Sequence, residues 1–370
     1  MTTLKFQYFP DDSLVGYARD IETYLYIAPV QDHHAKRLHR MERLGTGGFK
    51  AEIEVPDDAV GSFVIAPVSQ AVAGDIENAT DTRIRWRLLS KHVLSCQDPG
   101  VSVTPEAVIY PPEFDSESGR IFMPEAPARP GWPDTKSAVG RGIQDLWKEQ
   151  LIDNRPVWLA GSDTASHLLI LFDAQQWIRT PLPAVLERLH RGGELPEMRI
   201  VAVDTASNRL EDLGCSESFA DWVVGELLDH FPGFPANRVV AAGQSLGGLT
   251  ATNIARLYPD RISRVVGNSA SFWWPEKNGP AGGAMLHLLN DGAGSRDLVE
   301  NQVKFYFSAG TAEGGSAEPT MVDHMNTIAT ALEHNGIAVK AEVSTAAHEM
   351  AAWEGALTRG LLWHFGKQES

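Results

Sequence analysis

The sequence has few cysteines and no long apolar run, and both absences limit what kind of protein it can be. Its 370 residues include two cysteines, Cys96 and Cys215, which lie far apart along the chain. Two thiols give no disulfide framework and fit a reducing compartment. No stretch approaches the length of an apolar membrane-spanning helix, and residues 1–7 lack the apolar core of a signal peptide. We therefore expect a soluble, cytoplasmic protein.

Basic charge is also scarce. The chain carries 32 Lys and Arg against 48 Asp and Glu, which gives a formal net charge of −16. This excess of negative charge argues against binding to nucleic acid or to anionic membranes. The hydrophobic content of 43% is ordinary for a soluble protein, and the length suits one large domain and one smaller one. An anionic small molecule is not excluded, because a pocket can be locally basic.

Residues 1–134 have the pattern of a β-rich domain. Residues 23–28 and 62–66 are short runs of aromatic and β-branched side chains, and residues 49–55 alternate between apolar and polar. Short strands at this spacing indicate a small sandwich. Residues 105–133 are rich in proline, which predicts a covering segment or linker and not a packed element.

Residues 135–370 alternate between strand-like and helix-like segments. This alternation predicts an α/β domain, in which a mostly parallel sheet is covered by helices on both faces. The expected strands are residues 156–160, 167–172, 198–203, 262–267, 303–307 and 338–343, and the expected helices include residues 183–190, 218–230 and 318–335.

One stretch of this domain organises the rest. Residues 239–242 form an apolar, β-branched run, and the motif Gly243-x-Ser245-x-Gly247 follows it. A helical pattern comes next and ends at Pro259. Strand, sharp turn and helix in this order predict a nucleophile elbow, in which the Ser245 hydroxyl is lifted clear of the sheet. The backbone N–H of Leu246 then lies at a helix N-terminus, where it can meet a developing oxyanion.

A serine nucleophile needs a base, and in α/β-hydrolases the chain order is serine, acid, histidine. His348 follows the expected last strand in a loop of small residues, so we expect it to be the base. Two carboxylates compete for the role of the acid. Glu313 lies just beyond the strand at residues 303–307, whereas Glu318 precedes Pro319 at the start of a helix. The residue pattern favours Glu313, and Glu318 stays open as the alternative acid.

The second oxyanion donor is expected in the loop after the strand at residues 167–172. The backbone N–H of Ala174 is the candidate there, and Asp173 is expected to hold the turn.

Several of these segments resemble the enterochelin esterase family, α/β-hydrolases that cleave the ester backbone of tris-catecholate siderophores. The resemblance covers most of the chain, including the N-terminal part that plain esterases lack. The family's Ala-Gly-x-x-Glu-Pro stretch is split here, so that either glutamate aligns with the family acid. The matching segments are residues 26–34, 123–132, 171–174, 240–249, 268–275 and 347–357.

The resemblance implies a flat, aromatic and trianionic ligand, which calls for arginines and for stacking rings. The substrate-binding candidates are Trp273, Trp274, Arg129, Arg85 and Arg37. We expect the β-rich domain to help bind this substrate and not only to stabilise the fold. The pair His33-His34 has no third metal ligand at a suitable spacing, so we expect no protein-bound metal and no cofactor. Iron would enter only inside the substrate.

The leading hypothesis is therefore a serine esterase acting on a catecholate siderophore, as a monomer or weak homodimer. A general carboxylesterase or acyltransferase of the same fold is the alternative, since fold does not determine substrate. A siderophore-binding protein whose triad has decayed is a third hypothesis, which the presence of both Ser245 and His348 disfavours.

Overall fold

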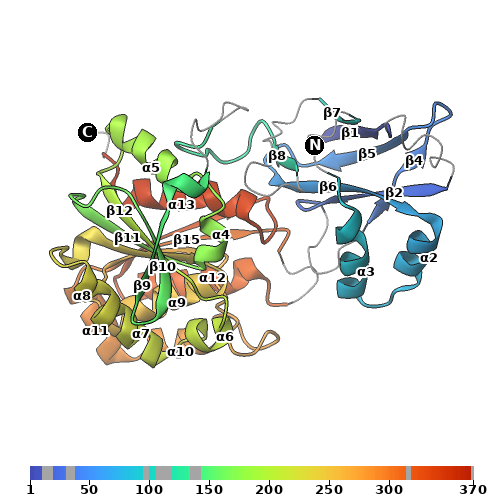
Figure 1. The fold of residues 1–370 in the computed structure, drawn as a ribbon. Helices are drawn as coiled ribbons and strands as arrows, with labels where there is room; N and C mark the ends of the chain where they lie inside the picture. Colours follow the sequence, from blue (N-terminus) through green and yellow to red (C-terminus); the bar gives the residue numbers. More distant parts are fainter. Residues whose placement is uncertain are drawn as a thin grey trace.

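The structure is a computed structural model that describes residues 1–10, 20–30, 38–94, 100–105, 119–133, 143–313 and 318–367. Its strands form two four-stranded sheets in the N-terminal part and one eight-stranded sheet in the C-terminal part. Figure 1 shows the N-terminal sheets in blue and teal beside the large sheet and its helices. The predicted domain boundary at residues 134 and 135 lies outside the described residues.

The two small sheets pack face to face as the predicted sandwich. Phe6 of one sheet meets Phe63 of the other with ring centroids 5.1 Å apart, and both side chains are buried. The strands alternate inward and outward residues, as a half-buried sheet requires. One sheet has the order β4-β5-β1-β7 and the other the order β3-β2-β6-β8. The strands are β1 (Thr2–Tyr8), β2 (Ile21–Ile27), β3 (His39–Arg40), β4 (Glu42–Arg43), β5 (Phe49–Val55), β6 (Val60–Ser69), β7 (Val101–Thr104) and β8 (Gly119–Phe122).

Two features of the sandwich differ from the sequence prediction. Helices α2 (Gln70–Asn78) and α3 (Thr82–Leu89) pack on the outer face of β2 and β6, with the Ser69 side chain capping α2. The expected covering segment at residues 105–133 contains β8, which is buried along its whole length and pairs with β6. The short apolar run of β8 completes this sheet. The sequence analysis missed the strand because the segment as a whole is rich in proline.

The large sheet has the order β16-β15-β14-β13-β11-β12-β10-β9. Strands β11 to β16 are parallel, whereas β9 and β10 are antiparallel at one edge. This confirms the predicted α/β-hydrolase class and its mostly parallel sheet. The strands are β9 (Lys148–Ile152), β10 (Arg155–Ala160), β11 (His167–Phe172), β12 (Met198–Val203), β13 (Val239–Gln244), β14 (Arg264–Asn268), β15 (Lys304–Gly310) and β16 (Ala338–Ser344).

Helices cover both faces of the large sheet, as β11 illustrates. Its residues Leu168 and Ile170 belong to one apolar cluster, and Leu169 and Leu171 belong to the other. The first cluster includes helices α6 (Arg209–Leu213), α7 (Glu217–Trp222), α8 (Leu228–His230), α9 (Leu246–Leu257), α10 (Gly283–Leu289), α11 (Gly292–Glu300) and α12 (Met321–His334). The second includes α4 (Ala174–Trp177), α5 (Leu182–Arg191) and α13 (Met350–Phe365). Within the described ranges, none of the helices has the length and apolar character needed to cross a membrane.

The sandwich and the large sheet are joined by a buried ion network. Glu354 of α13 is fully buried and pairs with Arg120 of β8 through one oxygen and with Arg129 through the other, the latter at 2.7 Å. The backbone oxygen of Glu354 also accepts a hydrogen bond from the Trp132 indole at 3.1 Å. One carboxylate therefore holds two guanidinium groups that approach from the N-terminal side.

We predict that Glu354→Ala lowers the free energy of unfolding by about 3 kcal/mol or more, because it leaves two guanidinium groups buried without their carboxylate. Urea denaturation followed by tryptophan fluorescence measures this change. Glu300→Ala, at an exposed position of α11, is the control and is expected to stay within about 0.5 kcal/mol of the wild type. Equal stability of the two variants would contradict the proposed importance of the network.

Candidate active site

The predicted elbow is present between β13 and α9. Ser245 occupies the turn with φ 56° and ψ −123°, a strained conformation for a residue with a side chain. The turn needs glycine at position 243, because a Cβ added there would lie 2.5 Å from the backbone carbon of Gly247. The tight packing of these two backbones is what holds the Ser245 hydroxyl beyond the end of the strand.

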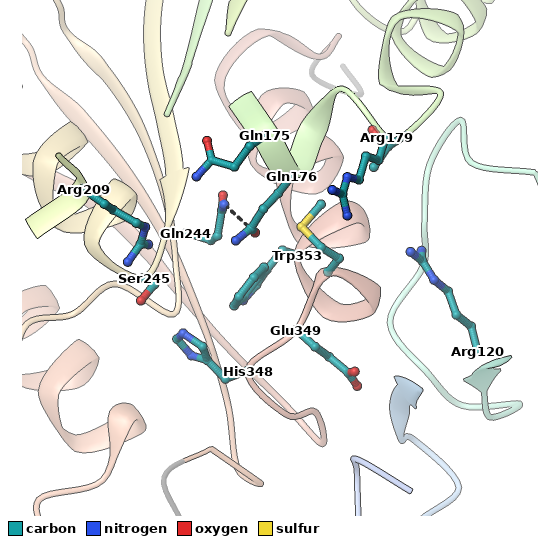
Figure 2. Close-up of a pocket in the computed structure, with 12 residues that line it drawn as sticks. Arg120, Gln175, Gln176, Arg179, Arg209, Gln244, Ser245, His348, Glu349 and Trp353 are labelled. Carbon is teal, nitrogen blue, oxygen red and sulfur yellow. Dashed lines mark hydrogen bonds between the residues drawn. The ribbon is translucent and has the colours of Figure 1, made fainter. Parts of the chain in front are cut away.

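Ser245 opens into a cavity of about 630 Å³. Figure 2 shows Ser245 and the His348 ring near one another on one side of this cavity, with Arg179 and Arg120 on the other. Gln175 and Gln176 of α4 lie between the two groups in this view. The cavity is lined by Arg120, Gln175, Gln176, Arg179, Thr180, Arg209, Gln244, Ser245, His348, Glu349, Met350 and Trp353.

Glu313 is the carboxylate that contacts the predicted base. Its Oε2 lies 2.7 Å from Nδ1 of His348, while its Oε1 accepts hydrogen bonds from the Ser269 hydroxyl and the Gly310 amide, each at 2.6 Å. Only 3% of Glu313 is exposed to solvent. Glu318, the other candidate, is exposed and takes no part in the hydrogen bonds of His348 to described residues. The structure thus favours Glu313 over Glu318.

Trp353 supports both the acid and the histidine, although the sequence analysis did not select it. Its indole N–H donates to the Ser269 hydroxyl at 2.8 Å, which leaves the hydroxyl proton to point toward Glu313. The indole also meets the His348 ring edge to face, with centroids 4.8 Å apart. The sequence signal for Trp353 was its position, five residues after His348 in a segment that resembles the family pattern.

The Ser245 hydroxyl has a second neighbour that the sequence analysis missed. Its oxygen lies 3.2 Å from the hydroxyl of Ser271, whose backbone N–H donates to the carbonyl of Ser245 at 2.9 Å. His348 borders the same cavity but makes no hydrogen bond with Ser245 in this structure, in which both residues are described. Catalytic hydrogen bonds of this kind often tighten only when the substrate is bound.

The two expected oxyanion donors lie at the same edge of the sheet. Leu246 is the first residue of α9 and Ala174 the first of α4, so neither N–H has an intrahelical acceptor. The preceding strands, β13 and β11, are adjacent and parallel. Their helices therefore begin side by side, and the role of the two N–H groups as oxyanion donors stays a prediction.

Asp173 holds the turn before Ala174, as expected. It has φ 62° and is fully buried. Its carboxylate accepts hydrogen bonds from Arg209 through Nε at 2.8 Å and Nη2 at 2.7 Å, and from the Thr205 hydroxyl at 2.7 Å. This paired, bidentate contact fixes both the turn and the arginine that lines the cavity.

Among the described residues, the arginines that line the cavity differ from Arg129 and Arg85, which were chosen from the sequence. Arg129 is paired with Glu354 and its side chain is only 9% exposed, so it acts in the buried ion network. Arg85 lies on α3 and donates to the carbonyl of Ala79 at 2.8 Å, outside the lining of the cavity. Arg37 lies outside the described residues, as does the pair His33-His34.

Three other arginines take their place in the lining. Arg120 contacts Glu354 and Arg209 contacts Asp173, whereas Arg179 is exposed and takes part in none of the ion pairs found among the described residues. Arg179 comes just after α4, two residues beyond its last residue. The sequence signal for Arg179 was its position, a few residues after the predicted oxyanion turn.

The tryptophan pair lies near the elbow but not in the lining of the cavity. Trp274 packs on the backbone of Gly214, whose added Cβ would come within 2.7 Å of its ring. Trp273 lies under the Lys277 ammonium, 5.2 Å from the ring centroid. Substrate stacking on either ring stays a prediction. Across the described part of the chain, no group of three or more His, Cys, Asp or Glu is arranged to hold a metal ion.

Comparison with known proteins gives consistent results. The model of a family described as putative esterase matches residues 156–364. The iron(III) enterobactin esterase of Escherichia coli O6:H1 (strain CFT073) is 27% identical over 361 residues, 92% of this chain and 85% of that protein. The crystal structure of an enterochelin esterase from Shigella flexneri is 25% identical and has a TM-score of 0.71, covering 98% of this chain and 92% of that chain. A structure of the Shigella flexneri enzyme in the presence of enterobactin has a TM-score of 0.74 at 24% identity, with 98% and 92% coverage.

We predict that Ser245 reacts with a fluorophosphonate probe and that Glu313→Gln slows this labelling by about a hundredfold or more, because the amide no longer fixes the His348 tautomer. Intact-protein mass spectrometry against time measures the rate. Glu318→Gln is the matched control and should label within about twofold of the wild type, since Glu318 is exposed. Equal slowing by both substitutions would show that Glu313 has no special role.

Proposed function

Because the chain belongs to the putative esterase family, we propose that it is a serine esterase that cleaves the ester backbone of a tris-catecholate siderophore such as ferric enterobactin. The observation that carries this proposal is the elbow serine sharing one cavity with a His348–Glu313 pair. The substrate class is supported by the iron(III) enterobactin esterases that the chain resembles over 92% of its length.

The first half of the reaction transfers the acyl group to the enzyme. The Ser245 oxygen attacks a backbone ester carbonyl while Nε2 of His348 takes the hydroxyl proton. Glu313 accepts the hydrogen bond from Nδ1 and stabilises the imidazolium that forms. The N–H groups of Leu246 and Ala174 donate to the oxyanion of the tetrahedral intermediate. The C–O bond then breaks, and His348 returns the proton to the leaving alkoxide.

Water completes the reaction by the same route. His348 takes a proton from the water as its oxygen attacks the acyl carbonyl, and Ser245 leaves with that proton restored. The products are a carboxylic acid and an alcohol, so a cyclic triester is opened to a linear chain. These steps use side chains and amides of the chain itself and no cofactor, and any iron arrives within the substrate.

The charges around the cavity suit an anionic ligand despite the net charge of −16. Three arginines of the described ranges line it, and the exposed Arg179 follows the end of α4 on the side opposite Ser245. Arg120 and Arg209 are paired with buried carboxylates, so it is the charge of Arg179 that can attract and orient a negatively charged substrate. We further propose that the protein acts in the cytoplasm, where its two thiols would stay reduced, as a monomer or weak homodimer.

Incubation with enterobactin, both ferric and iron-free, should yield linear products that chromatography resolves. Ser245→Ala should lower turnover by about a thousandfold or more while leaving binding nearly unchanged, because the hydroxyl acts in the reaction and not in docking. A Ser245→Ala enzyme that kept a tenth of the wild-type rate would contradict the assigned nucleophile. Rapid turnover of p-nitrophenyl esters with none of siderophores would instead indicate a general carboxylesterase.

Arg179→Ala should raise KM for the ferric siderophore about tenfold at low salt, since it removes a charged contact from the cavity. The increase should shrink at about 1 M salt, where screening already weakens the attraction. KM for a small neutral ester should not change. Arg296→Ala, at another exposed position on α11, is the control. An equal effect of both substitutions, or an equal effect on the neutral ester, would contradict the role of Arg179.

A further inference from the structure

Strand β6 of the sandwich presents alternate residues to the loop that carries His348. Phe63 and Ile65 point into the sandwich core. Val60 and Val64, on the opposite face, pack against Ala346 and Ala347. Ser62 lies between these two valines on the same face, so the strand alternation directs its side chain at the same loop.

Ser62 binds Glu349, the residue after His348, through two donors. The Ser62 amide donates to Oε1 of Glu349 at 2.8 Å, and the Ser62 hydroxyl donates to Oε2. Glu349 also lines the cavity. Burial raises the pKa of the Glu349 carboxyl, whereas the hydrogen bonds from Ser62 and the charge of Arg120 act in the opposite direction. Ser62 thus supplies donors for a carboxylate that would otherwise be costly to bury.

The residues before His348 are held by the same strand. The Val60 amide donates to the carbonyl of Thr345 at 2.9 Å, and Val60 and Ala346 form a parallel bridge. Ala347 is fully buried, in a cluster with Tyr26 and Val64. The sandwich therefore anchors the chain on both sides of His348, which lies in the connection between β16 and α13.

From this arrangement we propose that Ser62 is a positioning residue for the catalytic base, acting through Glu349. The inference rests on the proposed function, because it assumes that His348 is the base. A loop residue must be held to within about 0.5 Å for efficient proton transfer, and rotation at position 349 moves the preceding imidazole. The sandwich is then part of the catalytic apparatus. Its role extends beyond siderophore binding and includes the hydrolysis of any ester.

The test compares Ser62→Ala with Thr345→Val. Both remove one side-chain hydrogen bond between the sandwich and the His348 loop, since the Thr345 hydroxyl donates to Asp58 at 2.8 Å. We expect Ser62→Ala to lower kcat for p-nitrophenyl butyrate and the rate of fluorophosphonate labelling about tenfold each, with KM within about twofold of the wild type. Thr345→Val should leave both rates within about twofold, because the Val60 amide still donates to the Thr345 carbonyl and holds the loop there.

Substitutions at Glu349 distinguish the effect of its hydrogen bonds with Ser62 from the effect of its negative charge. Glu349→Gln can keep both contacts, because its carbonyl accepts from the Ser62 amide and its NH₂ donates to the Ser62 hydroxyl. Glu349→Ala keeps neither. We expect Glu349→Ala to lose at least as much activity as Ser62→Ala, and Glu349→Gln to recover most of that loss. If Ser62→Ala does not fold, the isosteric pair Ser62→Thr and Ser62→Val gives the same comparison.

Equal effects of Ser62→Ala and Thr345→Val on kcat would overturn the proposal, since the interface would then be merely structural. A rise in KM for the siderophore with no change on the small ester would also overturn it, in favour of a purely binding role. The small-ester and labelling readouts are independent of the siderophore. A failure of enterobactin hydrolysis would therefore remove the proposed substrate and leave this inference standing.

Discussion

The arrangement of the site depends on one buried carboxylate. Glu313 accepts hydrogen bonds from the Ser269 hydroxyl, the Gly310 amide and the His348 ring. These donors follow β14, end β15 and follow β16, so the parallel register of three neighbouring strands brings them to one edge of the sheet. A buried carboxylate with three donors has its hydrogen-bonding needs met and is held in one orientation. This is the condition for orienting an imidazole that must take and return a proton.

The sandwich and the large sheet contribute to the same site from opposite sides. The large sheet supplies Ser245, Glu313 and both helix N-termini. The sandwich supplies Arg120 to the cavity and Ser62 to the loop of His348. Glu354 holds the two parts together from the start of α13, where Trp353 also packs on His348. Stability and site geometry are therefore coupled through neighbouring residues of one helix.

The sequence was most informative where structure is local. Ser245 was identifiable because a strand, a turn with close-packed glycines and a helix follow one another within a few residues. His348 followed from its place after the last strand. The pairing of Arg129 could not be predicted because its partner, Glu354, lies 225 residues away, and pairing at that separation leaves no local pattern. The choice between Glu313 and Glu318 was open for a related reason: only the path of the loop after β15 decides which carboxylate reaches His348.

The central claim is that Ser245 forms an acyl-enzyme with a siderophore ester. Opening of a cyclic triester expels no fragment, so an acid quench within the first turnover should leave the whole substrate attached to the enzyme. Peptide mass spectrometry should place this adduct on the peptide that contains Ser245, and Ser245→Ala should form none. An adduct on a different side chain, or continued turnover by enzyme already blocked at Ser245, would contradict the account.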